Sequence, residues 1–247
     1  MFLQRLLFLP VVCALIAGCQ ASRPAPVTTP TPPTGRSATL PDSINWVQRS
    51  AEYYAAVIQM YRLATVRVEQ QASSRAPGTW AVILDADETI LSNLPYQIER
   101  VGLGYSPESW GAWVRRREAT ALPGAAAFLA RVHQLGGRIA IVTNRLDSEC
   151  GDTITVFKAQ SLAFDAMLCR PDEAPSDKNP RFDAVAAGKT AAGSTPLEVV
   201  AFVGDNIQDF PGLNQKLRQA GESGFGEFGV KYFLLPNPMY GSWQEGR

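Results

Sequence analysis

Histidine is almost absent from this chain of 247 residues, since His133 is the single one. One histidine argues against a His-rich metal centre and against enzymes that use histidine as their nucleophile. The chain also lacks an excess of either charge, with 23 basic and 23 acidic residues, and it contains no basic block. It therefore has no electrostatic footprint for nucleic acid, and we expect no nucleic-acid partner.

The apolar run from Leu6 to Ala17, which follows Arg5, is too short to span a membrane as a permanent helix. Its place and length are typical of a secretory signal. The run ends in Leu15-Ile16-Ala17-Gly18-Cys19, which resembles a bacterial lipobox with Cys19 as the lipidated residue. The alternative is an ordinary signal peptide that is cut after a small residue. With Gln20 rather than aspartate next, the resemblance implies a lipid anchor in the bacterial cell envelope, at the outer membrane.

Three segments follow from this interpretation. Residues 1–18 are the expected signal peptide, residues 19–41 are a linker rich in proline and threonine, and residues 42–247 are long enough for one folded domain. Cleavage before Cys19 removes Cys13, and lipidation occupies Cys19, so Cys150 and Cys169 are the cysteines that remain free to pair. An oxidising compartment permits a disulfide between these two, but two free buried thiols are an equal alternative on sequence alone.

The third segment is predicted to be an α/β domain. Apolar residues at three- and four-residue steps predict an N-terminal helix, capped by Asp42 or Ser43 and ending within residues 73–78. These apolar residues are Ile44, Val47, Ala51, Tyr54, Ile58 and Tyr61. From Trp80 onward strands and helices alternate, which predicts a parallel sheet covered by helices on both faces. The expected strands are 80–84, 139–142, 166–168, 199–203 and 230–235, and the expected helices are 123–135, 153–161 and 181–187.

Two carboxylates, Asp85 and Asp87, follow directly on the apolar run of residues 80–84. Open α/β sheets bind their ligands at the carboxyl ends of the strands, where these acids are expected. Two acids so close together repel each other and need a cation or a proton between them. Asp85 can act as a nucleophile and Asp87 as a proton donor, while Mg²⁺ can bridge their charge to a phosphate. The alternative is a solvated turn that happens to hold two acids.

The motif around these acids, Asp85-Ala86-Asp87-Glu88-Thr89-Ile90-Leu91-Ser92-Asn93-Leu94-Pro95-Tyr96, resembles that of the bacterial class C (DDDD) acid phosphatases. These enzymes belong to the haloacid dehalogenase (HAD) superfamily and have a Rossmann-like fold. Four further segments match the family in order. They are 141–145 (Ile-Val-Thr-Asn-Arg), 177–182 (Asp-Lys-Asn-Pro-Arg-Phe), 199–210, which ends in two aspartates, and 234–243, which resembles the family's C-terminal substrate loop.

The resemblance implies roles for individual residues. Lys178 is expected to bind the phosphate, with Arg181 as its rival in the same polar loop, and Thr143 and Asn144 to hold phosphate oxygens. A Mg²⁺ ion is expected on Asp85, on the backbone carbonyl of Asp87 and on Asp205. Asp209 is expected to bind the ion through water or to orient the other ligands; its alternative is a helix-start acid at the positive end of the helix dipole. A Thr-Asn pair alone is more often a polar turn.

Four aromatic residues, Trp110, Trp113, Tyr240 and Trp243, are expected near the mouth of the site. Tyr240 lies in the segment that resembles the substrate loop, where an aromatic ring stacks on a nucleobase. Trp110 and Trp113 are expected beside it, although two aromatics three residues apart more often pack against a core. The segment between residues 84 and 123 is too short for a large cap domain, so we expect a site open to solvent.

These features together predict a lipid-anchored, Mg²⁺-dependent acid phosphatase that hydrolyses small phosphomonoesters through an aspartyl-phosphate. The expected substrates are nucleoside 5'-monophosphates or nicotinamide mononucleotide. One alternative is a non-catalytic surface lipoprotein that binds a ligand on the same fold. A second is a dehalogenase, although that chemistry has no use for Asp87. The oligomeric state is left open, with a homodimer as one arrangement.

Overall fold

The computed structural model describes residues 39–190 and 195–245, so the expected signal peptide, Cys19 and most of the expected linker lie outside the described residues. In the described part, five strands form one sheet in the order β5-β4-β1-β6-β7. The strands are β1 (Trp80–Leu84), β4 (Arg138–Leu146), β5 (Ala166–Arg170), β6 (Glu198–Gly204) and β7 (Tyr232–Leu234). Every pairing between neighbours in this sheet is parallel, as the alternation of strands and helices predicted.

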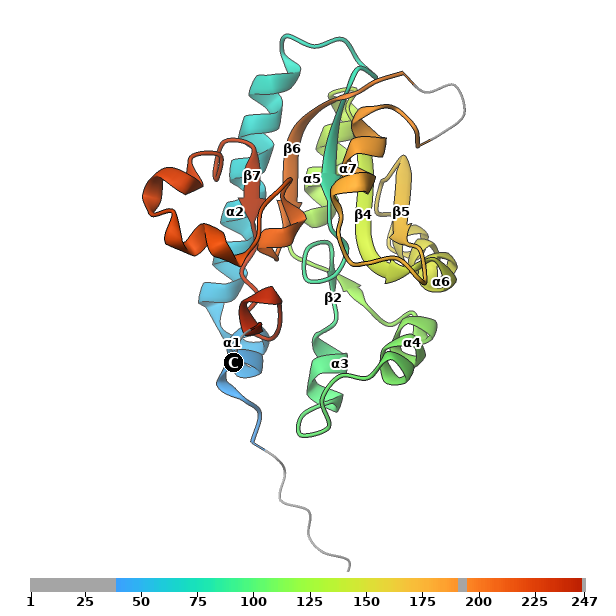
Figure 1. Ribbon diagram of the computed structural model, residues 1–247, viewed down its shortest axis with the longest axis vertical. Coiled ribbons are helices and arrows are strands. Elements are labelled where there is room, and N and C mark those ends of the chain that lie inside the picture. Colours follow the sequence, from blue (N-terminus) through green and yellow to red (C-terminus); the bar gives the residue numbers. More distant parts are fainter. Residues whose placement is uncertain (1–38, 191–194, 246–247) are drawn as a thin grey trace, which may run out of the picture. The chain divides into compact units, whose positions relative to one another are not determined.

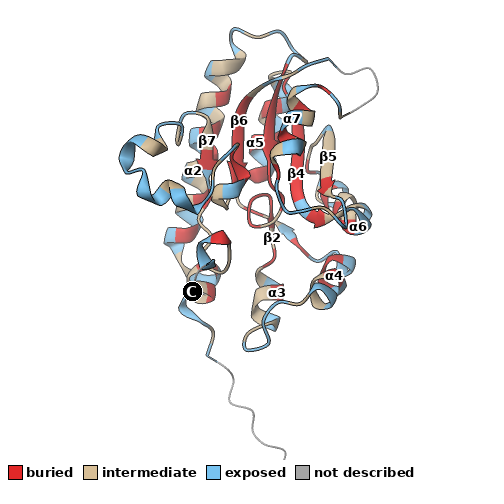
Figure 2. Ribbon diagram, viewed as in Figure 1, coloured by how far each residue is buried: buried red, intermediate tan, exposed pale blue. Residues whose placement is uncertain are grey.

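Strand β1 is the central strand, and all five of its residues are buried. Its side chains alternate between two apolar cores, with Trp80, Val82 and Leu84 in one and Ala81 and Ile83 in the other. A strand with a core on each face must be apolar throughout, which explains the uninterrupted apolar run in its sequence. Figure 2 shows this buried centre between helices whose outer sides are exposed.

Helices cover both faces of the sheet, which confirms the predicted architecture (Figure 1). One face packs against α2 (Ala51–Ala72), α5 (Ala125–Gln134) and α6 (Asp147–Ala159). The other face packs against α7 (Asn179–Ala186), which contributes Phe182 and Val185 to the second core.

The N-terminal helix is two helices rather than the single one predicted, namely α1 (Asp42–Arg49) and α2. Ser50 separates them: its backbone is extended, and its hydroxyl oxygen accepts a hydrogen bond from the amide of Tyr53 at 3.0 Å, which caps α2. The break changes the buried face. Tyr53 and Val57 are buried in place of the predicted Ala51, Tyr54 and Ile58, and Tyr54 is 56% exposed. The residue that precedes α1 is Pro41, so neither Asp42 nor Ser43 is its cap.

Helix α6 begins at Asp147, six residues before the predicted start, and the remaining predicted elements lie within a few residues of the observed ones. Several short elements had no sequence prediction. They are β2 (Leu91–Ser92), α3 (Leu94–Glu99), α4 (Pro107–Arg116) and β3 (Thr120–Ala121), and the 3-10 helices η1 (Ile207–Asp209), η2 (Gln215–Gln219), η3 (Glu222–Phe225) and η4 (Ser242–Gln244).

The insertion between β1 and α5 contains only the small antiparallel pair β2–β3 and the helices α3 and α4. Figure 1 shows α3 and α4 beyond the carboxyl end of the parallel sheet. The expectation that this segment holds no large cap domain agrees with these elements, and the insertion instead forms one wall of the site described below.

A disulfide joins Cys150 in α6 to Cys169 in β5, with their Cα atoms 6.0 Å apart. The sequence left this pairing open. The bond ties the edge strand of the sheet to the helix that covers it, and closing a loop of this length stabilises a fold by about 3 kcal/mol in the chain-entropy model. Among the described helices, none combines the length and apolar character that a membrane span needs.

Candidate active site

The carboxyl ends of β1 and β6 bring three aspartates together. Asp85 follows β1 and Asp205 follows β6, and the two strands are neighbours, so that the amide of Asp85 donates a hydrogen bond to the carbonyl of Val203 at 3.0 Å. Asp209 returns to the same point through the single turn of η1. One carboxylate oxygen of each of Asp85, Asp205 and Asp209 lies within 4.8 Å of the others.

Burial makes this cluster electrostatically costly. Burial raises the pKa of Asp205 well above its ordinary value, and repulsion from Asp209 and Asp85 raises it further. Burial likewise raises the pKa of Asp85, against the opposing effect of the Lys178 ammonium. A positive ion between these carboxylates relieves both the desolvation and the repulsion. The set is hard oxygen donors only, so the residues present fit a hard divalent metal ion.

Lys178 lies directly before α7, and its side chain is 4% exposed. Its ammonium contacts Asp85 at 2.5 Å and Asp209 at 2.6 Å. Burial alone lowers the pKa of Lys178, but attraction to Asp209 and Asp85 outweighs that effect and holds the pKa above its ordinary value. The ammonium is therefore a fixed positive charge beside the Asp85 carboxylate.

Arg181, the rival of Lys178 in the sequence analysis, lies elsewhere. Its guanidinium donates to the carbonyl of Thr143 and, at 2.6 Å, to the side-chain oxygen of Asn144. Thr143 is fully buried, and its hydroxyl accepts from the amide of Arg145 at 3.2 Å, whereas Asn144 is exposed and lines the cavity. Arg181 thus fixes the end of β4, while Lys178 is the cation that contacts Asp85.

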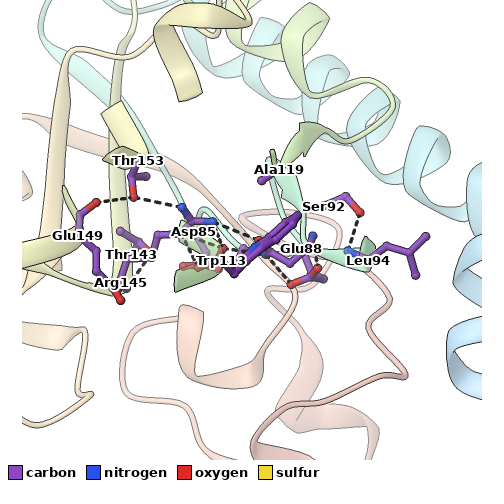
Figure 3. A network of polar contacts seen from close by, with 12 residues as sticks. Asp85, Glu88, Ser92, Leu94, Trp113, Ala119, Thr143, Arg145, Glu149 and Thr153 are labelled. Carbon is purple, nitrogen blue, oxygen red and sulfur yellow. Dashed lines mark hydrogen bonds and ion pairs between the residues drawn. The ribbon is translucent and has the colours of Figure 1, made fainter. Parts of the chain in front are cut away.

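The Asp87 carboxylate contacts a different set of groups. Its oxygen Oδ1 accepts hydrogen bonds from Nη2 of Arg145 at 2.7 Å and from Nδ2 of Asn93 at 2.8 Å. Figure 3 shows this polar network at close range, with Arg145 and Trp113 labelled. Sequence reasoning assigned no role to Arg145 or Asn93, although both lie within quoted motifs. A buried arginine requires an acidic partner, but the sequence does not say which acid it meets.

A cavity of about 910 Å³ opens onto these groups. Its lining includes Asp85, Asp87, Asp205 and Lys178, together with the aromatic rings of Tyr96, Tyr105, Trp110 and Tyr240. The cavity therefore places aromatic surface and the acidic cluster in one space, with a volume within the range of small-molecule sites.

Two of the three predicted stacking residues, Trp110 and Tyr240, line this cavity, but Trp113 does not. Trp113 is 2% exposed, and its indole N–H donates to the side-chain oxygen of Asn93 at 2.8 Å. A ring buried in the core has no face to offer a substrate, so the stacking assignment for Trp113 is wrong. Tyr240 also has a polar partner, because its hydroxyl donates to the carboxylate of Glu88.

Comparison with known proteins agrees with this geometry. The family model described as HAD superfamily, subfamily IIIB (Acid phosphatase) matches residues 14–243. Acid phosphatase 1 of Solanum lycopersicum is 27% identical over 197 residues, which cover 73% of this chain and 69% of that protein. The class C acid phosphatase of Bacillus anthracis is 28% identical, with a TM-score of 0.69 and coverage of 81% of this chain and 84% of that chain. Its structure with tungstate bound has the same identity and coverage and a TM-score of 0.70.

The chain belongs to the HAD superfamily, subfamily IIIB acid phosphatases. Its likeness to the Bacillus structures makes it a class C enzyme of that group, and so a phosphomonoesterase that acts on small phosphate esters. The family assignment therefore favours the phosphatase over both a dehalogenase and a non-catalytic ligand-binding lipoprotein.

Gly204, the last residue of β6, has no room for a side chain. A Cβ atom there would lie 2.7 Å from Cγ of Asp209 and closer still to its Cβ. We predict that Gly204→Ala displaces Asp209 from Lys178 and the other acids, and that kcat/KM for p-nitrophenyl phosphate falls by roughly 100-fold, the cost of about 1 Å of misplacement. The concentration of divalent metal needed for half-maximal rate should rise at the same time.

Gly151→Ala is the matched control, because a Cβ atom at Gly151 meets nothing within 4 Å. Equal activity and equal metal dependence of the two variants would show that Asp209 does not belong to the metal-binding arrangement.

Proposed function

We propose that this protein is a Mg²⁺-dependent acid phosphatase that works through an aspartyl-phosphate on Asp85. The observation that carries the proposal is the packing of Asp85, Asp205 and Asp209 around one point, with the buried ammonium of Lys178 beside Asp85. A cluster of oxygen donors with no histidine or sulfur favours Mg²⁺ over softer metals. Bound there by Asp85, Asp205, Asp209 and the backbone carbonyl of Asp87, Mg²⁺ would neutralise charge on the phosphate.

The residues of the chain divide the reaction into two steps. In the first, the Asp85 carboxylate attacks phosphorus, the bond to the leaving oxygen breaks, and the Asp87 carboxyl gives its proton to that oxygen. In the second, water attacks phosphorus and loses a proton to Asp87, the acyl-phosphate bond breaks, and phosphate and free Asp85 result. Lys178 stabilises the negative charge on the transferred group, and Asn144, which lines the cavity, holds another of its oxygens, whereas Thr143 is buried beneath the cavity wall.

Nucleoside 5'-monophosphates or nicotinamide mononucleotide are the proposed substrates. Trp110 and Tyr240 line the same cavity as Asp85, so a phosphate at Asp85 can carry an aromatic base that lies against these rings. A flat aromatic base gains from stacking, which a simple sugar phosphate lacks.

The covalent step predicts that Asp85→Asn removes the nucleophile and leaves less than a few per cent of the wild-type kcat, since an amide cannot replace the attacking carboxylate. The rate on p-nitrophenyl phosphate measures this directly, and a melting curve checks that the variant is folded. Asp183→Asn, at an exposed position of α7, is the control and should keep the full rate. A folded Asp85→Asn enzyme with substantial activity would exclude the aspartyl-phosphate.

Stacking predicts that Tyr240→Ala lowers kcat/KM for nucleoside monophosphates by roughly 5- to 150-fold, on the scale of base–aromatic stacking. A small alkyl phosphate, which has no ring to stack, should be affected far less. Tyr240→Phe separates the ring from the hydroxyl that contacts Glu88, and it should keep the preference for nucleotides. Equal losses on both substrates in Tyr240→Ala would make Tyr240 a packing residue and remove the main support for nucleotide substrates.

We also propose that the enzyme is a lipoprotein of the bacterial outer membrane, held by acyl chains on Cys19 and spaced from the lipid by residues 19–41. The support is the sequence run that ends at Cys19, because a multiply acylated cysteine binds a bilayer stably. Cys19→Ser is predicted to move the protein into the soluble periplasmic fraction or to leave it as an uncleaved precursor. Unchanged processing and unchanged membrane fractionation of this variant would contradict the lipid anchor.

A further inference from the structure

Asn93 is the centre of the polar network behind Asp87. Its side chain is fully buried, yet its hydrogen-bonding capacity is fully used. The two amide hydrogens are directed to Oδ1 of Asp87 at 2.8 Å and to a carboxylate oxygen of Glu88 at 3.2 Å. The amide oxygen accepts from the indole N–H of Trp113 at 2.8 Å and from Arg145 at 3.2 Å.

Trp113 determines which way this amide faces. An indole N–H can only donate, so it requires the oxygen of Asn93 on its side. The NH₂ group must then face Asp87 and Glu88, whose carboxylates accept hydrogen bonds. If the amide were reversed, one of its hydrogens would meet the indole N–H and its oxygen would meet two carboxylates. In a buried site each of these mismatches costs about 1–3 kcal/mol.

Arg145 holds Asp87 from the end of β4. Its side chain is 1% exposed, and Nε and Nη2 both contact the Asp87 carboxylate, at 3.0 and 2.7 Å to Oδ1. Thr153 in α6 accepts from Nη1 at 3.2 Å, which fixes the guanidinium in turn. The Asp87 carboxylate therefore accepts hydrogen bonds from two side chains, Arg145 and Asn93, which come from different parts of the chain.

We propose that Asn93 and Trp113 are positioning residues for the proton transfer by Asp87, which act through the orientation of the Asn93 amide and touch neither substrate nor metal. The proposal rests on the acid–base role proposed above for Asp87. A proton donor acts only within hydrogen-bond reach of the leaving oxygen, so a carboxyl that rotates away loses its contribution. Helix α4 of the insertion thereby sets the geometry of the acid at the sheet edge.

A second buried tryptophan, Trp80, helps to distinguish the positioning role of Trp113 from simple filling of the core. Trp80 is fully buried like Trp113, but its indole N–H has no hydrogen-bond partner. Packing in this core therefore does not need an indole N–H. The hydrogen bond from the indole N–H of Trp113 to Asn93 therefore has a role beyond the filling of core volume.

The test compares Trp113→Phe with the matched control Trp80→Phe on two substrates that differ in leaving group. An alkyl phosphate has a basic leaving oxygen that needs a proton, whereas 2,4-dinitrophenyl phosphate has a weakly basic one that leaves without it. We expect Trp113→Phe to lower kcat/KM for the alkyl phosphate by roughly 10- to 100-fold. The loss on the dinitrophenyl ester should be small, and Trp80→Phe should treat both substrates alike.

Asn93→Asp is a second variant for the same comparison of two substrates, and it keeps the proposal testable if Trp113→Phe does not fold. It keeps the shape of the side chain but replaces the NH₂ group by an oxygen that faces two carboxylates, so the loss on the alkyl phosphate should be at least as large. Equal effects on both substrates in the folded variants, or none, would overturn the positioning role.

Asp87→Asn is the reference that separates this proposal from the proposed function. If Asp87→Asn shows the leaving-group dependence and the other variants lack it, the acid role stands and the positioning role fails. If Asp87→Asn itself lacks that dependence, Asp87 is not the proton donor, and the proposed mechanism fails with it.

Discussion

The mutual repulsion of buried carboxylates is the constraint on which the rest of this structure depends. Asp85, Asp87, Asp205 and Asp209 converge at one edge of the sheet, and the cations in contact with them are Lys178 and Arg145. Among the described residues the acids here outnumber the cations that contact them, so a bound divalent metal ion would offset part of their repulsion. Lys178 and Arg145 are themselves buried, and a buried cation without an acidic partner destabilises the fold, so the attraction stabilises both the cations and the acids.

The backbone conformation after β1 directs Asp85 and Asp87 to different cations. Residues two apart in a strand point to the same side, so an extended chain would hold Asp85 and Asp87 together. The chain instead leaves the strand after β1, and Glu88 adopts a φ of 50°, a conformation that is uncommon outside glycine. Asp85 then contacts Lys178 while Asp87 contacts Arg145. One carboxylate can therefore act as nucleophile while the other handles protons.

The strands and the acids at their ends were predictable because both are local patterns. An apolar run buried on two faces and an acid at its end are visible in adjacent residues, as in 80–85 and 199–205. The break between α1 and α2 at Ser50 was not predictable, because the apolar periodicity of the sequence continues across it and only the cap at Ser50 separates the two helices. The contact of Arg145 with Asp87 and the Cys150–Cys169 bond join residues far apart in sequence. Their pairing depends on the finished fold, and spacing alone does not reveal it.

Trp110 and Trp113 were both expected near the mouth of the site, but their surroundings in the structure differ. Their spacing of three residues favoured packing against a core for both, and of the two only Trp113 is buried. Helix α4 instead lies at the border between cavity and core, so Trp110 lines the cavity while Trp113, one turn deeper, meets Asn93. The Arg145 guanidinium lies 5.5 Å from the ring of Trp110 and also grips Asp87. Helix α4 thus couples the wall of the substrate cavity to the acid at the sheet edge. A shift of this helix would displace Trp110 in the cavity wall and, through Trp113 and Asn93, the contacts of Asp87 at the same time.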